Sequence, residues 1–403
     1  MNKQTGAVSI FVVVFFMLLV TVVTVSFLRL MVNDQQQASN NDLSQSAYDS
    51  AQAGVEDAKR TLVAYRIYCS THTAAECKSA GDADHISSPI CNAAMGKAIG
   101  TNARTKTPEV PIQLSVDGTD FAALDQAYTC VTMDLQTKDY VGNITANQSQ
   151  LVPLVSLNAF DRVRVEWFSR EDISSNVVNL AGLSSSGQPL YTQGNWPINR
   201  PSLMRAQLIQ YKTNGFTLAS FDTVSGAQTN GATMFLYPTR QAGIGDRIMT
   251  DYDQRKTDPA DDPDPKDGLR TPTAVSCVTS LDAGGYACSS VLVLPQAVGA
   301  PNNADRTAFL RLLPLYNGTH FKVTLWNGPV TPAGTPVDFN GVQPLIDSTG
   351  RANDLFRRVQ SRVDLFDTTF PYPEGTINIT GNFCKDFAVT DTAYIPGSTA
   401  CTP

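Results

Sequence analysis

Hydrophobic residues are spread very unevenly along this chain, and the most apolar stretch lies close to its start. Residues 6–28 carry no charged side chain, and Arg29 ends the run. As an α-helix this stretch would be about 34 Å long, slightly more than the roughly 30 Å hydrocarbon core of a bilayer. A secretory signal usually has a shorter apolar region and a small-residue cleavage site, which Val25–Leu28 does not offer. The stretch therefore predicts a membrane span at 7–28.

A second pattern continues directly from the span. No proline or glycine occurs between Ala7 and Ala53. Beyond the span, small and apolar residues recur every three or four positions, which is typical of one stripe of an amphipathic helix. We therefore expect a single helix from Ala7 to Tyr65, although weak helix formers at 39–46 leave open an anchor followed by a separate helix. The stripe consists of Leu43, Ala47, Ala51, Val55, Ala58, Leu62 and Tyr65.

The N-terminal 65 residues resemble those of type IV pilins, and most closely those of PilX-type minor pilins. The resemblance rests on the short leader MNKQTG, the span that follows at once, and AYDSAQAGVEDA at 47–58. It implies cleavage by a prepilin peptidase between Gly6 and Ala7, after which Ala7 becomes the methylated first residue. Major pilins have glutamate at the fifth mature position, where this chain has Phe11. The resemblance therefore implies a minor subunit.

The same resemblance implies a function and a location. The chain would be a minor type IV pilin that helps pilus initiation or tip display and adhesion. It would lie in the bacterial cytoplasmic membrane as a single-pass protein, N-terminus inside, and enter a cell-surface pilus on assembly. Its partners would be other pilin subunits through the N-terminal helix, the prepilin peptidase, the inner-membrane assembly platform and a ligand on a host or partner cell. The alternative is an uncleaved membrane-anchored surface adhesin.

The remainder of the chain, 66–403, has the pattern of a β-rich extracellular head. Apolar and polar residues alternate in FDRVRVEWF at 160–168 and in HFKVTLW at 320–326, as in strands with one buried face. We expect an α+β fold, in which the long helix packs on a mainly antiparallel sheet with large insertions. The head is long enough for two sub-domains, with a break near 251–273.

The segment 341–365 is expected to form a hairpin that turns at 348–351, and it resembles the last strands of pilin sheets. In this hairpin the core-facing residues would be Leu355, Val359 and Val363. The residues on the opposite face would be Arg358, Gln360, Arg362 and Asp364.

Cysteines occur only after the long helix, and their number is even. An exported domain of this kind is expected to oxidise them to disulfides, for which 105 connectivities exist. Cys277 and Cys288 flank the expected hairpin tip at 282–285 and are expected to pair. The resemblance to pilins implies a second loop closed by Cys384 and Cys401. The other cysteines are Cys69, Cys77, Cys91 and Cys130.

Two metal sites are alternatives to this picture. Zinc could use Cys69, His72, Cys77, His85 and Cys91, but no C-x-x-C pair is present and an oxidising location disfavours it. The segment DYDQRKTDPADDPDPKDGLRTP, 251–272, is interpreted as a solvated acidic linker. Its calcium alternative lacks the order of an EF-hand loop. The candidate calcium ligands are Asp258, Asp261, Asp262, Asp264 and Asp267.

No sequence motif points to catalysis. The three histidines, His72, His85 and His320, lie in separate regions. GLSSSG at 182–187 is not a nucleophile elbow, and we find no P-loop, dinucleotide fingerprint or zincin helix. The sequence therefore predicts a protein that is not an enzyme and has no cofactor. With a net charge of −7, nucleic acid is not an expected partner. The basic cluster Arg351, Arg357, Arg358 and Arg362 is interpreted as a solvated strand face.

Overall fold

The structure is a computed structural model that divides into two compact units. The first contains residues 1–134 and 345–363, and the second contains 135–344 and 364–403. The boundaries between these units lie at 134/135, 344/345 and 363/364, whereas the sequence led us to expect a break near 251–273. The residues that the structure describes are 7–73, 75–76, 86–87, 109–112, 126–129, 131–180, 193–212, 231–240, 247–248, 272–299, 306–330 and 334–365.

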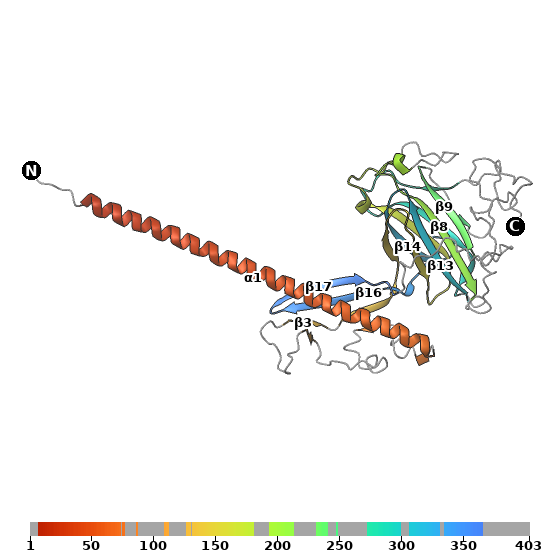
Figure 1. Cartoon of the computed structure of the whole chain (residues 1–403), viewed down its shortest axis with the longest axis horizontal. Helices are drawn as coiled ribbons and strands as arrows, with labels where there is room; N and C mark the ends of the chain where they lie inside the picture. The colour runs from red at the N-terminus through yellow and green to blue at the C-terminus, as the bar shows by residue number, and fades with distance from the viewer. Residues whose placement is uncertain are drawn as a thin grey trace, which may run out of the picture. The chain divides into compact units, whose positions relative to one another are not determined.

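The first unit is built around helix α1, which runs without a break from Ala7 to Thr71 (Figure 1). Its 65 residues correspond to about 97 Å of helix. The prediction of one continuous helix is confirmed, and the helix extends beyond Tyr65. The alternative of an anchor and a separate helix is wrong, because the weak helix formers at 39–46 are helical between two strongly helical flanks.

The upper half of α1 packs on strands β3, β16 and β17 of a six-stranded sheet. The strand order is β1-β4-β16-β3-β2, and β17 pairs with β16. The pairings β1–β4, β2–β3, β3–β16 and β16–β17 are antiparallel. The strands are β1 (Ile86–Ser87), β2 (Glu109–Pro111), β3 (Gln126–Thr129), β4 (Thr132–Thr137), β16 (Phe339–Ala352) and β17 (Leu355–Arg362).

The hairpin of β16 and β17 turns later than expected. Strand β16 continues through 348–351, and the turn is at Asn353 and Asp354. Asn353 has a φ of 53°, a left-handed conformation that asparagine adopts more readily than most residues. The predicted turn at 348–351 is therefore wrong, whereas the predicted faces of β17 are confirmed. Leu355, Val359 and Val363 are half-buried, and Arg358, Gln360, Arg362 and Asp364 are exposed.

The second unit consists of two sheets around one hydrophobic core. One sheet has the order β10-β12-β7-β14-β15, with β5 also paired to β14, and the other has the order β11-β9-β8-β13-β6. The pairs β10–β12 and β9–β11 are parallel, and the other registered pairs are antiparallel. The first sheet's strands are β5 (Tyr140–Ile144), β7 (Phe160–Ser169), β10 (Arg247–Ile248), β12 (Tyr286–Val298), β14 (Thr319–Asn327) and β15 (Thr335–Val337). The second sheet's strands are β6 (Gln150–Leu154), β8 (Leu203–Lys212), β9 (Gly231–Thr239), β11 (Thr273–Ser276) and β13 (Arg306–Leu315).

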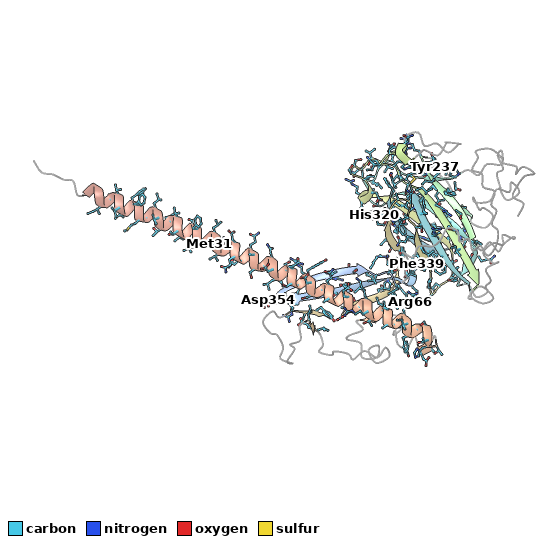
Figure 2. All side chains as sticks on the ribbon, viewed as in Figure 1. Met31, Arg66, Tyr237, His320, Phe339 and Asp354 are labelled. Atoms are coloured by element: carbon cyan, nitrogen blue, oxygen red, sulfur yellow. A yellow bond between two sulfur atoms is a disulfide. The ribbon has the colours of Figure 1, made fainter. Side chains whose placement is uncertain are left out.

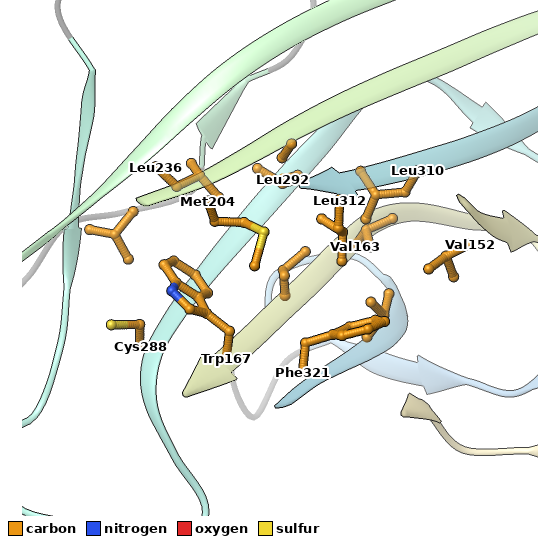
Figure 3. Packing of buried hydrophobic residues seen from close by; sticks show 14 of the residues in the cluster. Val152, Val163, Trp167, Met204, Leu236, Cys288, Leu292, Leu310, Leu312 and Phe321 are labelled. Carbon is orange, nitrogen blue, oxygen red and sulfur yellow. The ribbon is translucent and has the colours of Figure 1, made fainter. Parts of the chain in front are cut away.

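Side chains from both sheets meet in this core, as Figure 3 shows for Trp167, Met204 and Phe321. The Trp167 indole N–H donates to the Ser202 carbonyl oxygen at 3.1 Å, so the largest buried ring leaves no unpaired donor. The alternation predicted for β7 and β14 is confirmed, and the expected α+β class with it. The inward residues of these strands are fully buried: Val163, Val165, Trp167, Phe321, Val323 and Leu325.

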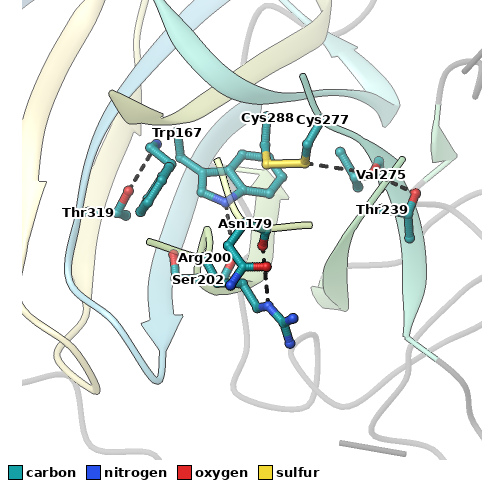
Figure 4. Close-up of a disulfide and its surroundings, with 10 residues drawn as sticks. Trp167, Asn179, Arg200, Ser202, Thr239, Val275, Cys277, Cys288 and Thr319 are labelled. Atoms are coloured by element: carbon teal, nitrogen blue, oxygen red, sulfur yellow. Dashed lines mark hydrogen bonds between the residues drawn. A yellow bond between two sulfur atoms is a disulfide. The ribbon is translucent and has the colours of Figure 1, made fainter. Parts of the chain in front are cut away.

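One disulfide lies beside this core. Cys277 and Cys288 are bonded, with Cα atoms 4.2 Å apart, and Cys288 lies next to Trp167 (Figure 4). The hairpin between them turns at Gly284 and Gly285, whose φ values of 74° and 80° favour glycine. The pairing predicted from the spacing of these two cysteines is confirmed.

Candidate assembly surface on helix α1

The lower half of α1 is uncovered, and most of it, from Ile10 to Val32, is rich in apolar side chains. Every side chain described from Ile10 to Asp42 is exposed, and Phe11 is 80% exposed. Met31, labelled in Figure 2, projects from this part of the helix. Soluble proteins rarely expose apolar surface on this scale, so the lower half is a candidate surface for lipid or for another protein.

The length and hydropathy of this half fit a membrane. Its most apolar window has a mean hydropathy of 2.9, and α1 is the single helix within the described residues that is long and apolar enough to cross a bilayer. The span predicted at 7–28 is therefore compatible with the structure.

Three polar side chains of the span, all among its described residues, bond to the helix itself. The hydroxyls of Thr21, Thr24 and Ser26 each donate to the carbonyl oxygen four residues earlier, at 2.8–2.9 Å. A hydroxyl without a partner would be costly in lipid or among apolar helices. Because these groups bond within the helix, the lower half can be surrounded by apolar material on every side.

Above Leu43 the helix packs on its sheet. The predicted stripe faces the strands: Leu43 and Tyr65 are half-buried, and the residues between them on this stripe are buried. These are Ala47, Ala51, Val55, Ala58 and Leu62. The helix is thus divided into a packed half and an unpacked half, with the change at about residue 43.

The closest helix–sheet contact is between backbones at Gly350 of β16. A Cβ atom placed on Gly350 would lie 2.1 Å from the Ala47 carbonyl oxygen and 2.2 Å from the Ala51 nitrogen. Only glycine in the strand and small residues in the helix allow this approach. Gly350 is therefore a packing residue, and this explains why it does not form the turn that its sequence context indicated.

A second close approach involves the glycine of the helix. A Cβ atom on Gly54 would lie 2.4 Å from the Ser348 hydroxyl oxygen and 2.8 Å from the Tyr128 ring. The Tyr128 hydroxyl donates to the Asp57 carboxylate at 2.6 Å, which fixes the helix along the sheet. At both glycines the missing side chain leaves room for the facing element. The backbone of α1 fills this room at Gly350, and the side chains of Ser348 and Tyr128 fill it at Gly54.

A polar contact closes the lower edge of the packed half. The Arg357 guanidinium of β17 donates through Nε and Nη2 to the Ser44 hydroxyl, at 2.8 and 2.6 Å. Sequence reasoning identified the small residues of the helix but missed Gly350, Ser348, Tyr128 and Arg357 as their partners. A glycine inside a strand pattern was the one available signal, because it indicates a close backbone approach.

The basic cluster is engaged in local contacts. Arg351 binds both carboxylate oxygens of Glu109, at 2.9 and 2.8 Å. Arg358 donates to Asp347, and this hydrogen bond lowers the pKa of the Asp347 carboxyl. Together with the Arg357–Ser44 contact, these bonds give three of the four arginines a structural role in this sheet.

The remaining predicted sites are mostly outside the described residues. These include the cleavage position at Gly6, the acidic segment 251–271 with Asp258, Asp261, Asp262, Asp264 and Asp267, and Cys77, His85, Cys91, Cys130, Cys384 and Cys401. Cys69 is disulfide-bonded, which removes it from the five candidate zinc ligands. His72 stacks on Tyr68 with ring centroids 3.7 Å apart. Within the described part of the chain, no three His, Cys, Asp or Glu side chains are arranged so that they could hold a metal ion.

His320 belongs to a polar network at one end of β7 and β14. Its Nδ1 lies 2.6 Å from an oxygen of Asp172, and its Nε2 lies 3.0 Å from Glu171. Asp172 also accepts the backbone N–H groups of His320 and Ser169. The carboxylate thus joins the 3₁₀ turn η1 (Arg170–Asp172) to both strands, which is a structural role.

Neither the family models nor the curated proteins that were searched match this chain. The features of the chain that indicate its class are the geometry of α1 and the N-terminal sequence pattern.

Proposed function

We propose that this protein is a minor type IV pilin, a filament subunit that helps pilus initiation or tip display and adhesion. The observation that carries the proposal is the division of α1 into an apolar, uncovered lower half and an upper half fastened to a sheet. The leader pattern before Ala7 supports the same class by resemblance.

A helix of this kind suits transfer from lipid to a filament. Its span, 7–28, is apolar on all sides, so neighbouring helices can replace lipid without exposing apolar surface to water. The hydroxyls of Thr21, Thr24 and Ser26 are already bonded within the helix and require no partner from outside. Before assembly the protein would lie in the cytoplasmic membrane with its N-terminus inside, and its partners would be other pilins, the prepilin peptidase and the assembly platform.

Position 11 is occupied by Phe11 and not by an acidic residue, which supports the role of a minor pilin over that of a major one. A carboxylate buried among helices is costly unless it is paired, and in major pilins it pairs with a neighbouring subunit's N-terminus. A subunit with Phe11 cannot make this ion pair, which sets the position of one subunit along its neighbour. A filament made of this chain alone is therefore disfavoured. An uncleaved anchored adhesin would share the span and the head, but it would not enter filaments.

The test places a charge in the lower half without touching the head. Val14→Asp should leave the protein folded and displayed but exclude it from filaments, because an unpaired charge would lie among apolar helices. Val14→Ala is the matched control, and Gln37→Asp adds the same charge on an exposed polar position. The readout is the amount of this subunit in sheared filaments relative to the amount in the membrane. Val14→Asp protein that is displayed normally and enters filaments at the level of both controls would contradict the proposal.

A further inference from the structure

Between the span and the packed half, α1 contains a segment held only by its backbone. The sequence NDQQQASNND at 33–42 is exposed at every position. Within these ten residues the described structure contains no side-chain hydrogen bond, ion pair or aromatic contact, whereas the hydroxyls of 21–26 and the side chains of 44–62 are engaged. Helical structure here depends on main-chain bonds that face water.

The composition of this segment opposes helix formation. Six of its ten residues are Asn, Asp or Ser, whose side chains compete for backbone hydrogen bonds and lower helix propensity. Its two charges, Asp34 and Asp42, have no Lys or Arg three or four positions away. A helix that is polar all round and lacks such pairs is not stable on its own in water.

Both flanks are held much more firmly. Below the segment, 10–28 is apolar and suited to a membrane or filament core, where an open backbone would be costly. Above it, the stripe from Ala47 to Leu62 is buried, and the ion pairs Lys59–Glu56 and Arg60–Asp57 span single turns. The weakest part of a 65-residue helix therefore lies between two anchored parts.

We propose that residues 33–42 form an extensible spacer that unwinds reversibly while the span and the head stay folded. Ten helical residues cover about 15 Å, and the same ten residues fully extended cover up to about 33 Å. Unwinding therefore lets the head move up to about 18 Å farther from the membrane or filament core and frees its orientation. The spacer acts in a plain anchor as well as in a pilus subunit, so the inference goes beyond the proposed function.

Hydrogen–deuterium exchange of the full-length protein in lipid nanodiscs tests the spacer. Amides of 33–42 should exchange at least about tenfold faster than those of 50–62, because local opening there disrupts no side-chain packing. In the variant Asn33→Ala/Ser39→Ala/Asn40→Ala/Asn41→Ala, exchange of 33–42 should slow by roughly tenfold or more, because alanine is the best helix former. Gln52→Ala, an exposed change in the packed half, is the matched control and should leave 33–42 unchanged.

Two results would overturn the spacer. One is protection of 33–42 equal to that of 50–62 in the unaltered protein. The other is a four-alanine variant whose 33–42 amides exchange as fast as before. Neither depends on filament entry, so a failure of the pilin proposal leaves these expectations unchanged.

Discussion

The substitution Gly350→Ala should separate α1 from its sheet. The new methyl carbon would point at the helix backbone, 2.1 Å from the Ala47 carbonyl oxygen and 2.8 Å from the Ser50 carbonyl carbon. These atoms cannot rotate away as the end of a side chain can. The helix must therefore retreat by more than about 1 Å to restore ordinary carbon contacts of roughly 3.5–4.0 Å.

The cost of this retreat has two parts. Overpacking a core by one methyl group typically costs 1–3 kcal/mol, and a clash with backbone belongs at the upper end of that range. A gap of 0.5–1 Å also loses a quarter to a half of the dispersion energy of the pairs it separates, which here include the buried Ala47, Ala51 and Val55. We expect the free energy that holds α1 on its sheet to fall by about 3 kcal/mol. The amides of the packed half should then exchange roughly 100-fold faster.

The assay must separate the two units. Hydrogen exchange of the amides of 47–62 reports the packed half of α1. The three tryptophans, Trp167, Trp196 and Trp326, all lie in the second unit, so their fluorescence reports that unit alone and should not change. Gly194→Ala is the control, because a Cβ atom at Gly194 meets nothing within 4 Å. If Gly350→Ala left the 47–62 amides as protected as Gly194→Ala does, the close backbone approach would be refuted.

Three further outcomes are expected. Cys288→Ala should lower the free energy of unfolding of the second unit by about 3 kcal/mol, the chain-entropy value for a bridge with a sequence separation of 11, as measured by tryptophan fluorescence in denaturant. Thiol labelling of native, unreduced protein should modify none of the eight cysteines, and labelling of several would contradict an oxidised head. Because Arg358 lowers the pKa of Asp347, this carboxylate stabilises the first unit above the ordinary value of about 3.9, and the gain is lost as pH falls through the lowered value. Asp347→Asn should remove that part of the acid sensitivity, which circular dichroism would detect on acid titration.

The helix could be predicted well because its signals are local. Apolar residues without a break predict the lower half, and a three-to-four-residue period predicts the stripe that includes Ala51 and Leu62. The predicted disulfide of Cys277 and Cys288 follows in the same way from a short spacing with glycines at its tip. Strand alternation around Trp167 and Phe321 also appears within a few residues.

Contacts between distant segments could not be predicted in this way. Gly350 looked like a turn residue, and only the approach of Ala47 and Ala51, about 300 positions away in the chain, explains it as a packing residue. The chain turns instead at Asn353. Asparagine, like glycine, adopts a left-handed backbone conformation more readily than most residues. The boundaries of the two units have the same cause, since β16 and β17 return from late in the chain to the sheet that packs on α1.

The central claim is that α1 carries the subunit into a filament after the leader is removed. The most direct measurement is the N-terminal residue of this protein recovered from sheared surface filaments, determined by mass spectrometry of the intact chain and its first peptide. We predict a chain that starts at methylated Ala7. Recovery of filament-bound protein that still contains Met1–Gly6 would contradict the claim.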